Sequence, residues 1–131
     1  MLLTLTDLSS ETLQGQIVRQ VRALILTGEL PSGADLPSIR ELARDQKVSV
    51  ITVQRAYETL LREGLIHSRR GKGFFVSELP DSEKRSLARE RLYERLLPIV
   101  SAAADEGLSR AEILESIDKV LENGDKRGEG R

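Results

Sequence analysis

The sequence predicts a mainly α-helical fold with one small β-hairpin: a winged helix-turn-helix domain followed by two C-terminal helices. Three features lead to this expectation. Two helix-start signals lie close together, at Ser38 and Ser49. The pattern of residues 64–76 predicts a tight hairpin with a basic, glycine-flanked loop. After Pro80 the helical pattern returns and continues through most of the remaining chain.

Length and composition limit the classes of protein to consider. The 131 residues suffice for one domain of ordinary size plus a short appendage. With two Phe, two Tyr and no Trp, the core must be built from aliphatic side chains. The chain has no Cys, which excludes disulfides and thiolate metal sites, and its single histidine, His67, cannot form a zinc site alone. We therefore expect neither a metal nor another cofactor.

The sequence carries no signal for a membrane, for export or for catalysis. Its apolar runs are far shorter than the roughly 20 residues of a membrane span. Residues 1–7 lack the basic-then-apolar order of a signal peptide, so we expect a cytoplasmic protein without a membrane partner. No paired carboxylates, nucleophile–base pair or phosphate-binding glycine motif can be assembled, so we do not expect an enzyme.

The charge of the chain is unevenly distributed. The formal net charge is −1, with +2 on residues 1–77 and −3 on residues 78–131. This asymmetry is modest, so the placement of the basic residues is more informative than their number.

Ahead of the two helix-start signals, the sequence predicts a short strand and a first helix. Residues 1–5 can form an edge strand. Ser9 or Ser10 can cap the helix, and Gly28 marks its end. The helix itself is predicted by apolar residues that recur at intervals of three and four: Leu13, Ile17, Val21, Leu24 and Ile25.

The second and third helices form the predicted helix-turn-helix. Ser38 and Glu41 make a capping box at the start of the second helix. Ser49 caps the third helix, which runs to Glu63 and ends at a left-handed Gly64. The residues expected on the inward faces are Ile39, Leu42, Ala43, Val53, Ala56, Tyr57, Leu60 and Leu61.

Two short strands close this domain. They are expected over residues 65–68 and 74–77, joined around Gly71 and Gly73. The winged helix-turn-helix domain then covers residues 1–77.

The composition changes after the hairpin. Residues 78–82 form a linker, and residues 83–122 form two helices, the second starting at a capping box of Ser109 and Glu112. Residues 123–131 are polar and Gly-rich, and we expect a disordered tail there.

Two amphipathic helices bury little when they fold only on each other, so their apolar faces call for a second copy of the chain. Alternatively, the helices simply cover the winged domain. Pro98 removes a backbone donor and should kink or divide the longer helix. The residues expected at a dimer interface are Leu92, Leu96, Val100, Ile113, Ile117, Val120 and Leu121.

The start of the third helix carries the residues best suited to reading DNA, because that end of a recognition helix points into the major groove. Gln54 can pair with adenine, and Arg55 with guanine or a phosphate. Val50 and Ile51 can contact the methyl groups of thymine.

Backbone contacts are expected from three further places. Ser49 and Thr52 offer hydroxyls and helix-start amides to a phosphate. Arg40, on the second helix, is placed for the DNA backbone or a base edge. The basic loop of the hairpin suits a phosphate or the minor groove and consists of Arg69, Arg70, Gly71, Lys72 and Gly73.

Each of these residues also has a structural interpretation. A basic hairpin tip can be only a solvated turn, and Arg40 only an exposed helix charge. Arg55 can pair with Glu58 or Glu11. His67, beside the loop, is better explained as structural or solvated than as a ligand. The two aliphatic residues that open the third helix can mark a buried position.

A set of residues within positions 11–76 carries a family resemblance: Leu36, Pro37, Ser38, Arg40, Leu42, Ala43, Val48, Ser49, Thr52, Val53, Ala56, Tyr57, Glu63, Gly64, Leu65, Gly71, Gly73, Phe74 (or Phe75) and Val76. In this order and spacing they resemble the GntR family of bacterial transcriptional regulators. The resemblance implies that Arg40, residues 49–52, Arg55 and residues 70–73 contact operator DNA. The chain departs from many relatives at Val50, where they have Arg, so operator preference does not transfer.

The short C-terminal part is similar to that of the YtrA subfamily, in which two short helices chiefly make a dimer. This resemblance implies a two-fold dimer on a palindromic operator, most simply as a repressor, with a small-molecule effector possible but unidentified. The alternative function is a winged-helix protein-interaction module without specific DNA binding, which the low net charge and the two aliphatic residues would suit. Salt-sensitive DNA binding distinguishes the two.

Overall fold

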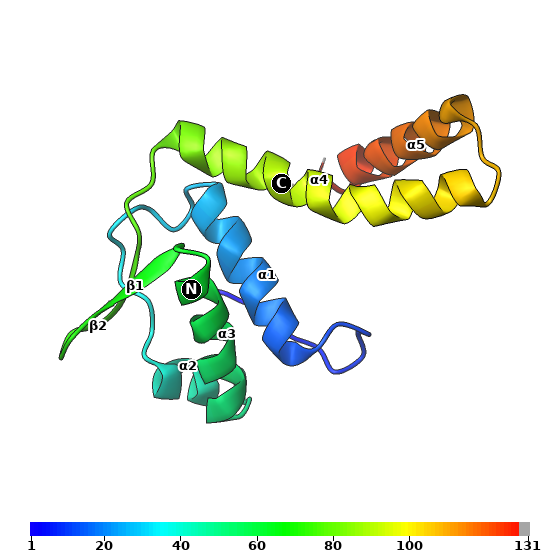
Figure 1. The fold of residues 1–131 in the computed structure, drawn as a ribbon. Helices are drawn as coiled ribbons and strands as arrows, with labels where there is room; N and C mark the ends of the chain where they lie inside the picture. Colours follow the sequence, from blue (N-terminus) through cyan, green and yellow to red (C-terminus); the bar gives the residue numbers. More distant parts are fainter. Residues whose placement is uncertain (129–131) are drawn as a thin grey trace. The chain divides into compact units, whose positions relative to one another are not determined.

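The computed structural model describes residues 1–128, and the chain forms two compact units, residues 1–86 and the part from Leu87 onward. The elements, in chain order, are α1 (Leu13–Leu26), α2 (Ile39–Gln46), α3 (Val50–Arg62), β1 (Ile66–Arg69), β2 (Gly73–Val76), α4 (Asp81–Asp105) and α5 (Arg110–Gly128) (Figure 1). The predicted fold class, a winged helix-turn-helix followed by two helices, is confirmed. None of the helices described is long and apolar enough to cross a lipid bilayer.

The core of the first unit forms where α3 packs against α1, α2 and β1. The stripe predicted on α1 is confirmed, because Ile17, Val21 and Ile25 are completely buried. Arg22 of α1 makes a bidentate ion pair with Glu63, with nitrogen–oxygen distances of 3.0 and 2.9 Å. This pair ties the middle of α1 to the end of α3.

Helix α1 is capped by Thr12, so the prediction of Ser9 or Ser10 as its cap was wrong. Thr12 Oγ1 accepts the N–H of Gly15 at 2.9 Å, whereas Ser9 closes a turn ahead of the helix. Several hydroxyl residues in a row all offer the same local bond, so the sequence alone did not select among them. The predicted end of the helix is confirmed at Gly28, whose φ is 83°.

The edge strand predicted over residues 1–5 was wrong, since glutamine side chains on α1 bind this segment instead. Gln20 exchanges two hydrogen bonds with the backbone of Thr4, at 2.7 and 2.8 Å. Gln16 does the same with Thr6, at 2.8 and 2.9 Å. A glutamine amide presents one donor and one acceptor, as a peptide group does. The segment therefore satisfies part of its backbone without a partner strand.

The two caps predicted for the helix-turn-helix are confirmed. Ser38 Oγ accepts the N–H of Glu41 at 3.1 Å at the start of α2. Ser49 Oγ accepts the N–H of Thr52 at 3.0 Å at the start of α3. Helix α3 is followed by Gly64 with a φ of 74°, as a left-handed C-terminal glycine requires.

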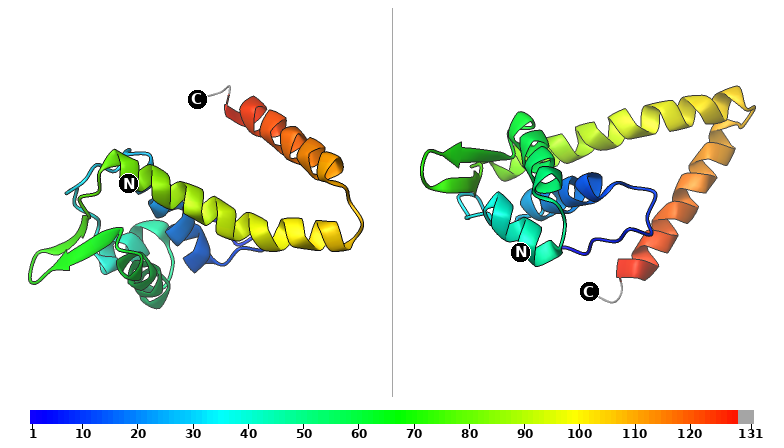
Figure 2. Two further views of the ribbon diagram at one scale, coloured as in Figure 1. Left: turned by 45° about the horizontal axis from the view of Figure 1, so that its top comes forward. Right: turned by 90° about the horizontal axis from the view of Figure 1, so that it is seen from below.

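Strands β1 and β2 lie within one residue of their predicted bounds and pair antiparallel, with Ile66 opposite Val76. A third segment, ahead of α2, joins them: the N–H of Leu36 donates to Phe74 O, and the N–H of Val76 donates to Ala34 O, both at 2.9 Å. The hairpin projects beyond the helices of the first unit in both views of Figure 2. Its base is thus fixed to the chain that leads into α2, while its tip is free.

Helix α4 begins at Asp81, slightly earlier than predicted, because the carbonyl of Pro80 accepts the N–H groups of Glu83 and Lys84 at 3.0 Å. It then continues as one helix through Pro98, so of the kink or division predicted there, the division was wrong. A proline removes one hydrogen bond, and here the helical turns on either side preserve the conformation.

Helix α5 starts at the predicted capping box. Ser109 Oγ accepts the N–H of Glu112 at 3.2 Å, and the N–H of Ser109 donates to Glu112 Oε1 at 3.1 Å. Hydrogen bonds from Ser109 lower the pKa of the Glu112 carboxyl. The helix continues to Gly128, so residues 123–128 are helical and not a disordered tail, because extending a formed helix needs no new nucleation. The prediction for residues 129–131 lies outside the described residues.

Tyr57 joins three parts of the first unit and is 1% exposed. Its hydroxyl donates to the carbonyl of Pro37 at 2.7 Å, ahead of α2. Its ring meets Phe74 of β2 edge to face, with centroids 5.0 Å apart. Burial, assisted by the negative charge of Glu41, raises the pKa of this hydroxyl above its usual range, so it remains a donor.

Replacing Tyr57 with Phe should lower the free energy of unfolding by about 1 kcal/mol, because the Pro37 carbonyl loses its donor while the ring still packs. Urea unfolding of the full chain measures the change. Tyr93→Phe is the matched control, since Tyr93 is 67% exposed, and it should leave the midpoint unchanged. Equal midpoints for both variants would contradict the structural role given to the Tyr57 hydroxyl.

Candidate nucleic-acid interface

The turn between α2 and α3 is short and tightly bonded. Lys47 ends α2 with a φ of 56°, in the left-handed region. The N–H of Val48 donates to the carbonyl of Ala43 at 3.0 Å, and Ser49 then caps α3. This geometry fixes where α3 starts and leaves its first turn at the surface.

The residues predicted to read bases lie on the exposed side of α3. Val50 is 46% exposed and Ile51 58% exposed, so the alternative that they mark a buried position was wrong. Gln54 and Arg55 are exposed as well, one turn further along. Gln54 Nε2 donates to Glu58 Oε1 at 3.3 Å, which orients the amide along the helix.

The two hydroxyls predicted to contact phosphate are already engaged in the cap. Ser49 Oγ and Thr52 Oγ1 lie 2.8 Å apart and share a hydrogen bond. Ser49 Oγ also accepts the N–H of Thr52. The hydroxyls therefore stabilise the helix start, which is where a phosphate would meet the exposed backbone amides.

Two arginines on the helix-turn-helix present unneutralised charge. Arg40 and Arg55 are exposed, and neither forms an ion pair with any residue that the structure describes. Arg55 has neither of the partners that its alternative interpretation required. Glu58 accepts the glutamine bond described above, and Glu11 pairs with Arg19 at 3.1 Å.

The tip of the hairpin, residues 69–73, forms the wing. The N–H of Lys72 donates to Arg69 O at 2.9 Å, closing a turn that needs the positive φ of Gly71, 75°. Arg70 and Lys72 are exposed at this tip, and within residues 1–128 their side chains have no partner. The wing therefore presents two free cations on a backbone that lies close to the surface.

Arg69 is placed differently from the other two wing cations. Its guanidinium carbon lies 4.7 Å from the centroid of the Phe75 ring, within cation–π range. His67, opposite Phe75 in the hairpin, stacks on the same ring with centroids 5.9 Å apart. These contacts agree with the structural interpretation of His67, and they hold Arg69 against the outer face of the hairpin.

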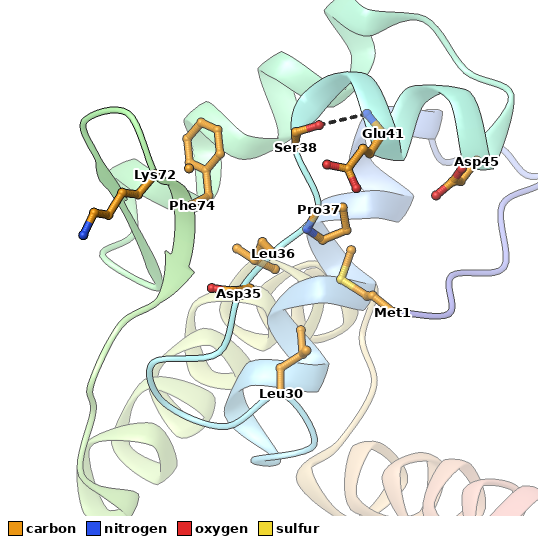
Figure 3. Close-up of a pocket in the computed structure, with 11 residues that line it drawn as sticks. Met1, Leu30, Asp35, Leu36, Pro37, Ser38, Glu41, Asp45, Lys72 and Phe74 are labelled. Carbon is orange, nitrogen blue, oxygen red and sulfur yellow. Dashed lines mark hydrogen bonds between the residues drawn. The ribbon is translucent and has the colours of Figure 1, made fainter.

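A hollow of about 480 Å³ lies between the start of α2 and the wing. Figure 3 shows Asp35, Glu41 and Asp45 around it, while the Lys72 ammonium group points away from the carboxylates of Glu41 and Asp45. Three carboxylates disfavour an anion inside the hollow. The hollow therefore does not suit a phosphate, whereas the wing tip and the exposed side of α3 carry the free cations described above.

Sequence reasoning missed two contacts that position this surface. The pairing of Leu36 with Phe74 involves too few residues for a strand pattern to show. The Tyr57 hydroxyl binds the backbone carbonyl of Pro37, a partner that no side-chain motif records.

A helix-turn-helix with an exposed second helix, followed by a basic wing, defines the class of winged helix-turn-helix DNA-binding regulators. Comparison with protein-family models matches residues 13–76 to the family described as bacterial regulatory proteins, gntR family. The chain belongs to this GntR family and is a DNA-binding transcriptional regulator similar to proteins named YtrA.

Its relatives extend the match beyond the winged domain. The chain is 36% identical over 119 residues to YhcF, an uncharacterised HTH-type regulator of Bacillus subtilis, covering 88% of this chain and 95% of YhcF. It is 43% identical over 70 residues to the HTH-type repressor YtrA of the same bacterium, covering 53% and 54% of the two chains. A solved GntR-family factor, YtrA from Sulfolobus acidocaldarius, aligns with a TM-score of 0.59 at 33% identity, over 73% of this chain and 98% of that one. Because YhcF matches over nearly its whole length, the likeness includes the C-terminal helices.

Proposed function

We propose that this regulator acts as a homodimeric repressor that binds a palindromic operator through α3 and the wing. The observation that carries the DNA-contacting part is the set of exposed, unpaired cations on one helix-turn-helix and its wing: Arg40, Arg55, Arg70 and Lys72. Such cations replace condensed counterions when they meet phosphates, which is the main source of affinity for DNA. The remaining predicted contacts are Ser49, Val50, Ile51, Thr52, Gln54, Arg69, Gly71 and Gly73.

The dimer is proposed because the second unit has no core of its own. From Leu87 to residue 126, no side chain is buried. A groove of about 520 Å³ between α4 and α5 is lined almost entirely by aliphatic side chains. All seven residues predicted for the dimer interface line it: Leu92, Leu96, Val100, Ile113, Ile117, Val120 and Leu121.

Two helices with this much uncovered apolar surface need a partner to be stable in water. A second copy offers the same surface and so covers the groove by two-fold symmetry, which leaves no need to assign it to an effector. Two symmetry-related recognition helices then meet half-sites about one DNA turn, roughly 34 Å, or a multiple of it apart.

Repression, rather than activation, and a cytoplasmic location follow from this proposal. A relative of this chain is named a repressor, and a dimer seated on a promoter excludes polymerase by occupying the same DNA. The cytoplasm is the proposed compartment, because operator DNA lies there.

Removing one phosphate contact should reduce the salt dependence of DNA binding. We expect Lys72→Ala and Arg40→Ala each to lower the slope of log K against log salt by about 0.9, because one counterion fewer is released. The measurement is a fluorescence-anisotropy titration of the full chain on a duplex that it selects from randomised DNA, at several salt concentrations.

Arg19→Ala is the matched control for these variants. Arg19 is an exposed arginine of the same unit, but it lies on α1 and pairs with Glu11. This variant should keep the wild-type slope. Failure of the wild-type chain to bind any duplex at low salt would reject DNA binding and favour the protein-interaction alternative.

A charge in the groove should break the dimer, whereas the same charge beside it should not. Val100→Glu places a carboxylate where a second copy is proposed to pack, and we expect its mass in sedimentation equilibrium to fall to that of a monomer. Ser101→Glu puts the same group at the next position of α4, outside the groove, and should remain dimeric. A dimeric Val100→Glu variant, or a monomeric wild-type chain at micromolar concentration, would refute the proposed interface.

A further inference from the structure

In the first turn of α3 the polar side chains form hydrogen bonds within the helix, whereas the large apolar side chains are exposed. Its polar side chains are bonded within the helix: Ser49 and Thr52 share a hydrogen bond at 2.8 Å, and one turn later Gln54 donates to Glu58. Its large apolar side chains are open, with Val50 46% and Ile51 58% exposed. What this turn offers to an incoming surface is therefore chiefly aliphatic.

The major groove contains one apolar feature that an aliphatic side chain can match. Among the base edges there, only thymine carries a methyl group, at its C5 position. The other edges present hydrogen-bond donors or acceptors, and covering those with Val or Ile would leave them unpaired and desolvated. Two aliphatic side chains at the tip of a recognition helix thus favour thymine and disfavour the alternatives.

We infer that Val50 and Ile51 determine operator specificity by contacting thymine methyl groups in each half-site. The inference rests on the proposed function, because it requires α3 to lie in the major groove. Successive residues of a helix are rotated by about 100°, so Val50 and Ile51 meet different bases. Arg55 lies one turn from Ile51 on the same side and supplies the free polar contact next to the apolar ones.

This kind of recognition has a distinct physical signature. A methyl contact releases no counterions, so removing it weakens binding at every salt concentration by the same factor. Removing a cation changes the slope instead. The two contributions can therefore be separated in one set of titrations.

The test uses the full chain and a duplex that it selects from a randomised pool. Each thymine of one half-site is replaced in turn by uracil, which keeps both hydrogen-bonding edges and lacks only the methyl group. At one or two positions we expect Kd to rise about fourfold, the loss associated with one buried methyl-sized group. The slope of log K against log salt should stay unchanged.

Variants of the protein then assign each methyl to a side chain. Val50→Ala or Ile51→Ala should weaken binding to the thymine duplex and abolish the effect of uracil at its own position. Alanine is a strong helix former at exposed positions, and thermal unfolding checks that each variant folds. Leu8→Ala is the matched control, because Leu8 is 97% exposed and lies outside α3; it should retain the full uracil effect.

The outcomes separate this inference from the proposed function. If the chain selects a duplex but no uracil changes Kd by as much as twofold, the thymine contacts are rejected while DNA binding stands. If uracil weakens binding equally in wild type, Val50→Ala and Ile51→Ala, the two residues do not read the methyl groups. If no duplex is bound at low salt, both proposals fail together.

Discussion

Helix α3 has to bury one face completely and keep its first turn in solvent, and the rest of the first unit is built around that constraint. Val53, Ala56 and Leu60 have no exposed surface, so α3 is held by α1, α2 and β1 at once. Tyr57, on the same face, reaches the carbonyl of Pro37 and the ring of Phe74. One side chain therefore connects the recognition helix with the approach to α2 and with the hairpin. A displacement of α3 would disturb all three, which keeps the residues of the candidate interface in a fixed relation to one another.

The second unit, unlike the first, does not bury its apolar side chains within itself. Its helices are well formed locally, with a reciprocal capping box between Ser109 and Glu112, but no side chain described from Leu87 onward is buried. Local hydrogen bonds fix where a helix starts, whereas apolar burial decides whether two helices stay together. On the proposed dimer, most of that burial comes from the other copy. Association and stability of the second unit are then linked by mass action.

Dimerisation would also strengthen binding to a palindromic operator. Once one half-site is bound, the effective concentration of the second recognition helix at the other half-site rises.

The features that the sequence predicted well are those set by short-range chemistry. The caps at Ser38, Ser49 and Ser109 and the left-handed Gly64 each depend on a few neighbouring residues. The failures involve partners distant in sequence or choices among equivalent local options. The segment before α1 was mistaken for a strand because its hydrogen bonds go to Gln16 and Gln20 of α1, which lie 10 and 16 residues further along the chain. Thr12 caps α1, although Ser9 and Ser10 could each offer the same hydrogen bond.

In the candidate site the types of residue could be predicted from the sequence. Whether each side chain is paired with another residue or free could not. Only coordinates distinguish Arg55, which is unpaired, from Arg69, which lies over an aromatic ring.

The low net charge of the chain bears on how an operator would be selected. Long-range attraction to DNA scales with positive charge, and here the formal total is only −1. We therefore expect binding to arbitrary DNA, which depends almost entirely on phosphates, to be weak and to decline further with salt. Contacts made only on a matching sequence then account for a larger share of the affinity. Aliphatic contacts of the kind offered by Val50 and Ile51 add no affinity for arbitrary phosphates. Because the genome presents an enormous excess of competing sites, the ratio of specific to non-specific affinity matters more than the affinity itself. A chain of low net charge whose recognition helix ends in an apolar tip is therefore expected to improve that ratio mainly by lowering its affinity for non-specific DNA.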